Sequence, residues 1–203
     1  MTFHTWITEH DLSKDPFEQF QSWFSEAISK STKYPEAMTL ATCTPDGVPS
    51  ARVVLFKGLN SKGLCFFTNY ESRKSNELIE NPRAALVFYW SALDRQIRIE
   101  GTIEKVSEKE SDDYWGSRPR ESCISALTSA QSQLVSSREE LEKRFFELIK
   151  KYEGQPVPRP AHWGGFCLVP KKFEFWVEGA HRLHDRFCYE RTAQGWRLSR
   201  LSP

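Results

Sequence analysis

Closely spaced turn signals between short apolar segments constrain the fold of this chain more than any other feature. The segments AMTLATC (37–43), ARVVLFKG (51–58) and LCFFTN (64–69) are each typical of a β-strand. Asp46-Gly47 and Lys62-Gly63 lie between them and are typical of hairpin turns. Strand-like segments recur at residues 84–90, 95–107, 172–179, 186–191 and 196–201. Sequential hairpins at this spacing predict an antiparallel barrel or sandwich.

Helical segments are expected between these strands. Asp15 is a good N-cap for a first helix, whose apolar face is Phe17, Phe20, Phe24 and Ile28. A second helical region begins near Glu108, is broken by Pro119 and resumes at residues 138–152. The Pro-rich stretch EGQPVPRPAHWGG (153–165) is expected to be a loop. The fold class predicted is therefore α+β and mainly antiparallel, with helices around the strands.

The composition narrows the class of protein. Its 28 Lys and Arg nearly balance 27 Asp and Glu, which argues against a general nucleic-acid or membrane-surface binder. No apolar run approaches the roughly 18–20 residues that span a bilayer, and the first residues lack the pattern of a signal peptide. Five widely spaced cysteines form no CxxC motif, so we expect reduced thiols in a cytoplasmic globular protein.

One helix start in the sequence TNYESRKSNELIENPR (68–83) carries unexpected charges. Ser72 is a good N-cap, yet the first two helical positions are Arg73 and Lys74. A helix N-terminus carries partial positive charge and favours Asp or Glu there. Either Arg73 pairs with Glu77 one turn on, at little cost, or a phosphate accepts the free N–H groups and makes both cations its partners.

The sequence HRLHDRF (181–187) holds a second group of cations. Arg182, His184 and Arg186 alternate, so on a strand they would project from one face. Such a face is either the solvated outer face of an edge strand, or its cations are directed at a bound anion. His181 and His184 have no acidic or Cys partner at ligand spacing, so no metal site is expected.

The sequence YWGSRPRES (114–122) holds a third group. Tyr114 and Arg118 lie one helical turn apart and Ser122 follows, which gives either a phosphate cradle or an exposed helix end. Arg52 and Lys57 bracket an apolar strand and point to opposite faces if the strand is regular.

These separate groups of cations suit small phosphorylated ligands better than a polyanion, because the chain has almost no net charge. Gln131-Ser132 adds neutral hydrogen-bonding groups. No GxGxxG or GxxxxGK motif is present, so a phosphorylated cofactor would be bound by side chains on a β scaffold.

Together, and in this order, these pieces resemble the pyridoxine (pyridoxamine) 5′-phosphate oxidase family. The matching segments span about residues 35–203 and include RVVLFK, TNYESRKSNELIENPR, RQIRIEG, SRPRES, HWGGF, FEFW, HRLHDRF and WRLSRLSP. The resemblance implies a split β-barrel of Greek-key type, built as one FMN-binding domain over residues 1–203. It also implies a homodimer with FMN at the subunit interface.

The resemblance implies roles for particular residues. Arg73 and Lys74 would grip the FMN phosphate, which would explain the unexpected helix start. The implied cofactor-binding residues are Arg52, Val53, Val54, Leu55, Phe56, Lys57, Phe67, Thr68, Arg73, Lys74, Gln96, Gln131, Ser132, Trp176 and Arg186. The implied substrate-binding residues are Lys57, Tyr114, Arg118, Ser122, Arg182, Leu183 and His184, of which Arg182 and His184 would be catalytic.

The implied reaction oxidises pyridoxine or pyridoxamine 5′-phosphate to pyridoxal 5′-phosphate. Molecular oxygen would be the acceptor, with hydrogen peroxide as a product and ammonia released from the amine. The cofactor carries the difficult step and the protein positions it. Two alternatives on the same fold are a binding protein for FMN or pyridoxal phosphate and a flavin reductase.

Two features depart from the family pattern. The first 14 residues, expected to be a mobile segment, lack the adjacent arginines and the Tyr that often close over the substrate. A lid here would be built from His4, Trp6 and His10. Phe67 stands where a Tyr is frequent, which keeps packing against the flavin but loses a hydroxyl contact.

Overall fold

The computed structural model describes residues 7–30 and 32–203, and an eight-stranded antiparallel sheet organises them. Its order is β2-β1-β4-β5-β6-β7-β8, and β3 pairs with β6 off this path. The strands are β1 (Ala37–Cys43), β2 (Pro49–Leu55), β3 (Leu64–Asn69), β4 (Arg83–Trp90), β5 (Arg95–Lys105), β6 (Trp163–Val177), β7 (Asp185–Thr192) and β8 (Gly195–Leu201). The prediction of a mainly antiparallel α+β fold is therefore confirmed.

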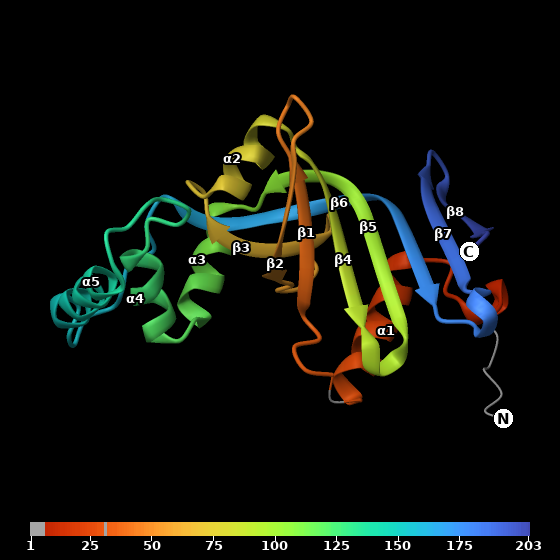
Figure 1. The fold of residues 1–203 in the computed structure, drawn as a ribbon, viewed down its shortest axis with the longest axis horizontal. Coiled ribbons are helices and arrows are strands. Elements are labelled where there is room, and N and C mark those ends of the chain that lie inside the picture. Colours follow the sequence, from red (N-terminus) through yellow and green to blue (C-terminus); the bar gives the residue numbers. More distant parts are fainter. Residues whose placement is uncertain (1–6, 31) are drawn as a thin grey trace.

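Five α-helices accompany the sheet within the described residues. They are α1 (Pro16–Ser29), α2 (Arg73–Glu80), α3 (Glu108–Ser117), α4 (Arg120–Thr128) and α5 (Arg138–Lys151). The break predicted at Pro119 separates α3 from α4. Figure 1 shows α3, α4 and α5 at one end of the long axis and β7 and β8 at the other.

The hairpin turns follow the local sequence. In β1 and β2, Ala37 pairs with Leu55 and Cys43 with Pro49, and the turn between them contains Gly47 at φ +89°. A positive φ is costly for residues with a Cβ, so Asp46-Gly47 specifies this turn.

The core lies between α1 and the inner face of the sheet. Phe20 and Trp23 of α1 pack against fully buried aromatic rings of the strands, including Phe88 and Phe175. The helix face predicted at its C-terminal end is wrong, because Ile28 is exposed and Ala27 is buried in its place. Trp23 and Ala27 lie one turn apart, so the buried stripe is rotated from the predicted one.

Strand β6 is the longest element and runs through both halves of the molecule. It pairs with β3 over Trp163–Leu168 and with β7 over Lys172–Val177. The loop predicted for residues 153–165 is therefore wrong at its end. Gly164 and Gly165 are strand residues that pair with Thr68 and Phe67 of β3. They are glycines because the Tyr70 hydroxyl and the Phe67 ring occupy the space that a Cβ would need.

The sheet is not a closed barrel. Among residues 7–30 and 32–203, β2 and β8 form the two ends of the strand order and do not pair with each other. The sheet is strongly coiled instead. Strand β3 pairs with the first part of β6, at the end of β6 that lies away from β7 (Figure 1).

The chain before α1 packs against the last strands from residue 7 onwards. The Ile7 N–H donates to Asp185, and the Tyr189 hydroxyl donates to the Ser13 carbonyl at 2.7 Å. Of the residues proposed for a lid, His10 is exposed in a short 3₁₀ turn, whereas His4 and Trp6 lie outside the described residues. No helix within 7–30 and 32–203 is long and apolar enough to cross a membrane.

Candidate functional site

The start of α2 is built by a network of small hydroxyl side chains. Ser72 is the N-cap residue, as predicted, but its side chain does not cap the helix. The Ser72 and Ser75 hydroxyls instead donate to the Asn69 carbonyl, which fixes the end of β3 against the first turn of α2. The Ser75 N–H already donates to the Ser72 carbonyl, so the N–H groups of Arg73 and Lys74 are the ones left for another acceptor. One of them, at Arg73, donates to the Ser132 hydroxyl at 3.2 Å.

Lys74 is a buried cation that contacts only neutral groups. Its side chain is 9% exposed, and Nζ lies 2.8 Å from the Gln131 side-chain oxygen. The hydroxyls of Thr68 and Ser72 accept its other two hydrogen bonds at 3.0 Å each. Burial, followed by repulsion from Arg52, lowers the pKa of Lys74 to about 8. A buried charge without a counter-ion is costly, so this position is suited to an anion. We call Thr68, Arg73, Lys74, Gln131 and Ser132 the α2 cluster.

Glu77 connects both arginines next to this cluster. It is buried, its Oε1 lies 2.8 Å from Arg73 Nε, and its Oε2 lies 3.3 Å from the Arg52 guanidinium. The hydroxyls of Ser50 and Thr42 also donate to Oε2. Burial opposes its ionisation, but these hydrogen bonds and Arg73 hold the pKa of Glu77 at about 2. The pairing of Arg73 with Glu77 that the sequence allowed is present, and it leaves Lys74 without a carboxylate.

We expect the substitution Glu77→Gln to lower the free energy of unfolding by about 2–3 kcal/mol, because it removes a buried carboxylate that pairs with the partly buried Arg52 and with Arg73. The ionised Glu77 stabilises the fold fully above pH 4.5, and this contribution is lost as pH falls towards about 2. The gap between wild type and variant in urea unfolding should therefore narrow over that range. Glu142→Gln, at an exposed i,i+4 pair with Arg138, is the matched control and should change little. A gap that stays constant from pH 5 to 2 would contradict this role of Glu77.

A cavity of about 370 Å³ opens beside the α2 cluster. The cavity is lined by Phe67, Thr68, Asn69, Arg118, Ser122, Ser125, Ala126, Ser129, Gln131 and Trp163. The cavity therefore brings together residues from β3, from the α3–α4 junction and from the loop after α4. The family resemblance implies that some of these residues bind the cofactor and others bind the substrate. Two predicted substrate residues, Arg118 and Ser122, share one wall.

Aromatic rings hold Arg118, the cationic residue in the lining of this cavity, in place. The Arg118 guanidinium lies 4.4 Å from the Trp163 ring centroid and donates to the Ser122 carbonyl at 2.8 Å. The Tyr114 ring stacks on Phe67 with centroids 4.0 Å apart. Burial raises the pKa of Tyr114, so its phenol stays protonated and is available as a donor. Arg118, like Lys74, forms no ion pair within residues 7–30 and 32–203.

A second group of predicted residues meets on the outer face of β5, β6 and β7. Gln96 is the register partner of Trp176, and Trp176 is the partner of Arg186. The Arg186 Nε lies 3.0 Å from the Glu174 carboxylate, whose other oxygen is 3.3 Å from Arg98. Glu174 is buried, so it holds Arg186 as Glu77 holds Arg73.

A tight turn before β7 carries the two predicted catalytic residues. Arg182 and His184 would share a face with Arg186 only on a strand, but β7 begins at Asp185, and Arg182 has a φ of +65° in a 3₁₀ turn. The turn is close because the Leu183 carbonyl approaches Gly179, where an added Cβ would lie 1.9 Å from its oxygen. His184 packs on Trp176, with ring centroids 4.7 Å apart. We call Gln96, Trp176, Arg182, His184 and Arg186 the β6–β7 cluster.

The main-chain N–H of Gly179 fixes the protonation of His184. It donates to Nδ1 at 3.1 Å, so Nδ1 is an acceptor. The neutral ring consequently carries its proton on Nε2, which is directed away from Gly179 and can donate to a ligand.

The two clusters lie far apart within one chain. Thr68 of the α2 cluster pairs with Gly164 near the start of β6, whereas Trp176 lies near its end. Twelve residues of extended strand correspond to about 40 Å along the strand at 3.3 Å per residue. Figure 1 shows the same separation, with α2 and α4 near one end of β6 and β7 at the other.

The predicted segment 52–57 has two different faces. Val53 and Leu55 of β2 point outwards and are exposed, Val53 by 66%. Val54 is partly buried against the core and Phe56 is buried in it, and the Phe56 N–H donates to the Glu36 carbonyl just before β1. The Lys57 N–H donates to the Cys65 carbonyl beyond the end of β2. Leu183, at the other predicted site, is exposed.

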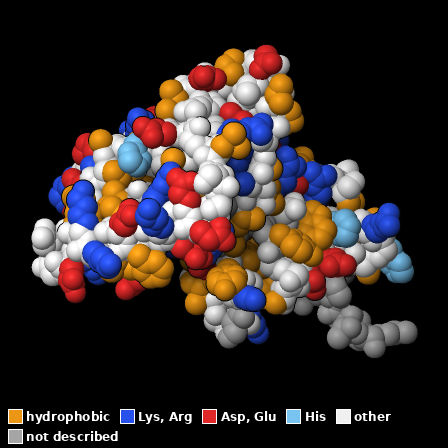
Figure 2. Space-filling model, turned by 60° about the vertical axis from the view of Figure 1, so that its left-hand side comes forward, with side chains coloured by type: hydrophobic (Ala, Val, Ile, Leu, Met, Phe, Trp, Pro, Cys, Tyr) orange, Lys and Arg blue, Asp and Glu red, His pale blue; other side chains and the backbone are white. Residues whose placement is uncertain are grey.

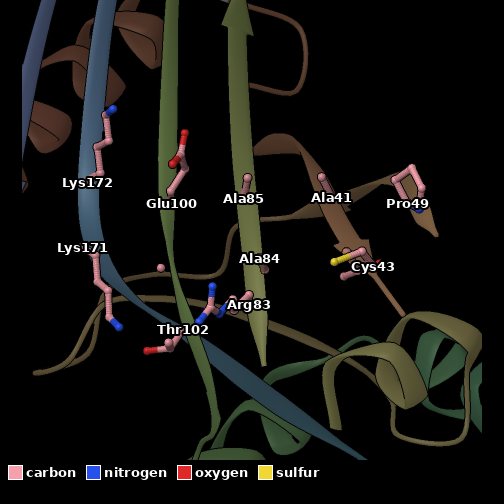
Figure 3. A pocket seen from close by; sticks show the side chains of 12 residues that line it. Ala41, Cys43, Pro49, Arg83, Ala84, Ala85, Glu100, Thr102, Lys171 and Lys172 are labelled. Atoms are coloured by element: carbon pink, nitrogen blue, oxygen red, sulfur yellow. The ribbon is translucent and has the colours of Figure 1, made fainter. Parts of the chain in front are cut away.

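A larger hollow of about 560 Å³ lies elsewhere, on the outer face of the sheet. Figure 3 shows it along β1, β4, β5 and β6, with Ala41, Ala85, Glu100 and Lys172 side by side. No predicted site residue lines it, and small side chains dominate its floor. In the view of Figure 2, Lys and Arg side chains are interspersed with Asp and Glu rather than gathered into one basic surface. We therefore take the smaller, polar cavity as the candidate site.

Three residues with structural roles at these clusters were not predicted. The sequence indicates Glu77 only as a partner of Arg73 one helical turn away. Its contact with Arg52 depends on the packing of α2 on β1 and β2. Glu174 lies two residues before Trp176 on the same strand face, which is a signal that the sequence did offer. Gly179 is recognisable only from its close approach to Leu183. Across residues 7–30 and 32–203, no group of His, Cys, Asp and Glu is placed to hold a metal ion.

Two family models match this chain. One, described as Pyridoxamine 5′-phosphate oxidase, covers residues 24–152, which include the α2 cluster and the lining of the cavity except Trp163. The other, described as the Pyridoxine 5′-phosphate oxidase C-terminal dimerisation region, covers residues 163–203 and most of the β6–β7 cluster.

Individual relatives agree with these models. The chain is 52% identical over 98% of its length to a pyridoxine/pyridoxamine 5′-phosphate oxidase from Gloeothece citriformis, of which 94% is covered. It is 51% identical over 97% of its length to the oxidase of the same name from Rubrobacter xylanophilus, of which 91% is covered. Among solved structures, PhzG from Burkholderia lata, in complex with tetrahydrophenazine-1-carboxylic acid, is 32% identical with a TM-score of 0.93 and coverage of 99% and 98%. An FMN binding protein from Nostoc punctiforme, 18% identical with a TM-score of 0.75, covers 95% of this chain and all of its own and shares the fold. This chain belongs to the pyridoxamine 5′-phosphate oxidase family of oxidoreductases.

Proposed function

We propose that this protein is an FMN-dependent oxidase that converts pyridoxine or pyridoxamine 5′-phosphate to pyridoxal 5′-phosphate. Molecular oxygen would be the electron acceptor, hydrogen peroxide a product, and ammonia a further product from the amine. The observation that carries the proposal is Lys74, a buried cation at the start of α2 whose partners among the described residues are all neutral. The names of the 52% identical relatives support the substrate class.

The α2 cluster fits the phosphate of FMN. Lys74 supplies a charge that lacks a counter-ion, Arg73 supplies a guanidinium and an N–H group, and Ser132 supplies a hydroxyl. Thr68 and Gln131 already contact Lys74 and would hold it towards the phosphate. FMN would supply the acceptor for the electrons of the substrate and their transfer to oxygen.

The site is proposed to be shared between two copies of the chain. The α2 cluster and the β6–β7 cluster are too far apart along β6 to contact one FMN within a single chain. Trp176 and Arg186 lie on the outer face of the sheet, which also exposes Val53 and Tyr89 by 66% and 60%. A homodimer that buries this face would place the β6–β7 cluster of one copy beside the α2 cluster of the other.

The cavity next to the α2 cluster fits the phosphate of the substrate. Arg118 has no carboxylate partner among the described residues and is fixed by Trp163, so its guanidinium is pre-oriented. Tyr114 and Ser122 would add hydroxyl donors, and Lys57 a further cation. Anchoring the phosphate uses binding energy remote from the reacting carbon to align the ring.

The tight turn is proposed to orient the reacting end of the substrate. Arg182 would orient the ring and stabilise charge that develops near the carbon being oxidised. His184 would donate from Nε2, because its Nδ1 is occupied by the Gly179 N–H. Its role is thus to position a substrate oxygen, and not to accept a proton at Nδ1.

Two alternatives on this fold need fewer of these residues. A protein that only binds FMN or pyridoxal phosphate would not require Arg182 and His184 beside Trp176. A flavin reductase would not require the separate phosphate cavity around Arg118. We further propose a single FMN-binding domain over residues 1–203. Its five cysteines, free in the structure, suit a cytoplasmic location.

We expect Arg182→Leu to lower turnover of pyridoxine 5′-phosphate by about 100-fold or more, because a charge aimed at the reacting carbon is removed. FMN should remain bound, since the α2 cluster is untouched. Turnover is measured by peroxide release and FMN by absorbance after gel filtration. Unchanged turnover would remove Arg182 from the mechanism.

Mixed dimers provide the control for a shared site. Co-expressing Arg182→Leu with Lys74→Met produces heterodimers in which one of the two sites combines an intact α2 cluster with an intact β6–β7 cluster. We expect these heterodimers to regain a substantial part of the activity that both homodimers lack. Heterodimers as inactive as their parents would show that both clusters act within one chain.

A further inference from the structure

Cys65 and Cys167 face each other across two strands that also carry the wall of the candidate cavity. Cys65 lies in β3 and Cys167 in β6, and they are direct register partners. Directly opposed residues of an antiparallel pair project from the same face of the sheet. Among the described residues, no other two of the five cysteines are register partners.

The backbone hydrogen bonds identify this as the close type of pair. The Cys65 N–H donates to the Gly58 carbonyl, and the Cys65 carbonyl accepts from the Lys57 N–H. Both groups of Cys65 therefore point away from β6, and the two cysteines form a non-hydrogen-bonded pair. Such pairs have Cα atoms about 4.5 Å apart, which is at the short end of the range that a disulfide bridges.

The two thiols are chemically different. A hydrogen bond from Cys167 lowers the pKa of Cys65 in spite of its burial. The same bond, followed by burial, raises the pKa of Cys167. Cys65 is 6% exposed and Cys167 is 1% exposed, so a small oxidant has more access to Cys65. Cys65 is thus the sulfur that meets an oxidant first and Cys167 the sulfur that follows.

We propose that Cys65 and Cys167 form a peroxide-sensitive dithiol that closes into a cross-strand disulfide. The Cys65 thiolate attacks one peroxide oxygen and the O–O bond breaks, and the departing hydroxide takes up the proton that the Cys65 thiol released, so the products are a sulfenic acid on Cys65 and water. The Cys167 sulfur then attacks the Cys65 sulfur, the S–O bond breaks, and the departing hydroxide takes the Cys167 proton as a second water. Overall the two thiols lose two electrons and two protons, and one hydrogen peroxide is reduced to two waters.

The position of this pair gives the disulfide a structural consequence. Phe67 and Gly165 are the next non-hydrogen-bonded pair along the same strands, and the Phe67 ring packs over Gly165 and against Tyr114. The bond would tie β3 to β6 next to this aromatic wall. Because the two cysteines are about 100 residues apart in sequence, it would also close a long loop in the unfolded chain. The proposal goes beyond the oxidase activity and does not depend on it, since the oxidant can be added.

The test treats the FMN-loaded full-length protein with hydrogen peroxide, blocks free thiols, and maps the digested peptides by mass spectrometry. We expect a peptide pair linked through Cys65 and Cys167, lighter by two hydrogens than its reduced parts and absent after treatment with dithiothreitol. The oxidised protein should also unfold several degrees higher than the reduced protein, because the closed loop is long.

Single substitutions provide the controls. Cys43→Ser, which removes a more exposed thiol outside the pair, should leave the link unchanged. Cys167→Ser should abolish it and let Cys65 proceed to sulfinic acid. Wild-type protein in which Cys65 and Cys167 stay reduced, or in which Cys65 is over-oxidised while Cys167 stays free, would overturn the proposal. This result comes from peptide masses, so it is independent of whether the protein turns over pyridoxine 5′-phosphate.

Discussion

Lys74→Met is expected to weaken FMN binding by about 100-fold, the cost of losing one charged hydrogen bond of roughly 2–3 kcal/mol to the phosphate. The substitution replaces a buried ammonium by an apolar side chain of similar length. It also removes a charge that only neutral oxygens surround, so the FMN-free variant should be at least as stable as the wild type. Fluorescence titration measures the first effect and thermal unfolding of the FMN-free protein the second. A purely structural lysine would show the reverse pattern, with unchanged FMN affinity and lower stability.

The pH dependence of FMN binding provides a second test of Lys74. The pKa of Lys74 is about 8 in the structure, and a bound phosphate would raise it by stabilising the ammonium. FMN affinity should therefore fall as pH rises above about 8, and Lys74→Met should lack this fall. Lys109→Met, at an exposed pair with Asp113, is the matched control and should bind FMN as the wild type does.

Gly179→Ala is expected to lower turnover by about 100-fold, as displacement of catalytic groups by an ångström can do. An added Cβ would lie 1.9 Å from the Leu183 oxygen and 3.2 Å from the His184 Cα, so the turn has to open. Opening it moves Arg182 and breaks the bond between the Gly179 N–H and His184 Nδ1. FMN affinity should change far less, because Trp176 and Arg186 are fixed by strand pairing.

Gly116→Ala is the matched control for this substitution. Gly116 lies in α3, and an added Cβ there would meet no atom within 4 Å. Alanine is favoured over glycine within a helix, so this variant should fold normally and retain full turnover. If Gly179→Ala also retains full turnover while folding normally, the tight turn does not position the catalytic groups.

Local patterns in the sequence were sufficient for much of the fold. Asp46-Gly47 marks a hairpin that the structure contains, and Pro119 separates two helices where expected. The sequence also pointed to Arg73 and Lys74, because cations at a helix start oppose the helix dipole. Each of these signals depends on neighbours within a few residues.

Features that depend on long-range packing were not predictable in this way. Gly164 and Gly165 read as loop residues, but they are strand positions where Tyr70 and Phe67 need space. Arg182 and His184 alternate in sequence as on a strand, yet the approach of Leu183 to Gly179 turns the chain there.

Sequence patterns also could not show that the site is formed by residues that are distant from one another in the chain. Gln131 meets Lys74 through a loop 57 positions further along the chain. Glu77 acquires its second arginine only when α2 packs on β1 and β2. The separation of the α2 and β6–β7 clusters follows from the length of β6. Because residues 153–165 were predicted to be a loop, the first part of this strand was not predicted.

The central claim is that FMN on this protein receives electrons from a phosphorylated pyridoxine and passes them to oxygen. The direct measurement is the visible absorbance of the FMN-loaded protein under anaerobic conditions after addition of pyridoxine 5′-phosphate. We expect loss of the yellow absorbance, its return when air is admitted, and formation of pyridoxal 5′-phosphate. Tightly bound FMN that keeps its absorbance with both pyridoxine and pyridoxamine 5′-phosphate would contradict the claim and leave a flavin-binding member of the family.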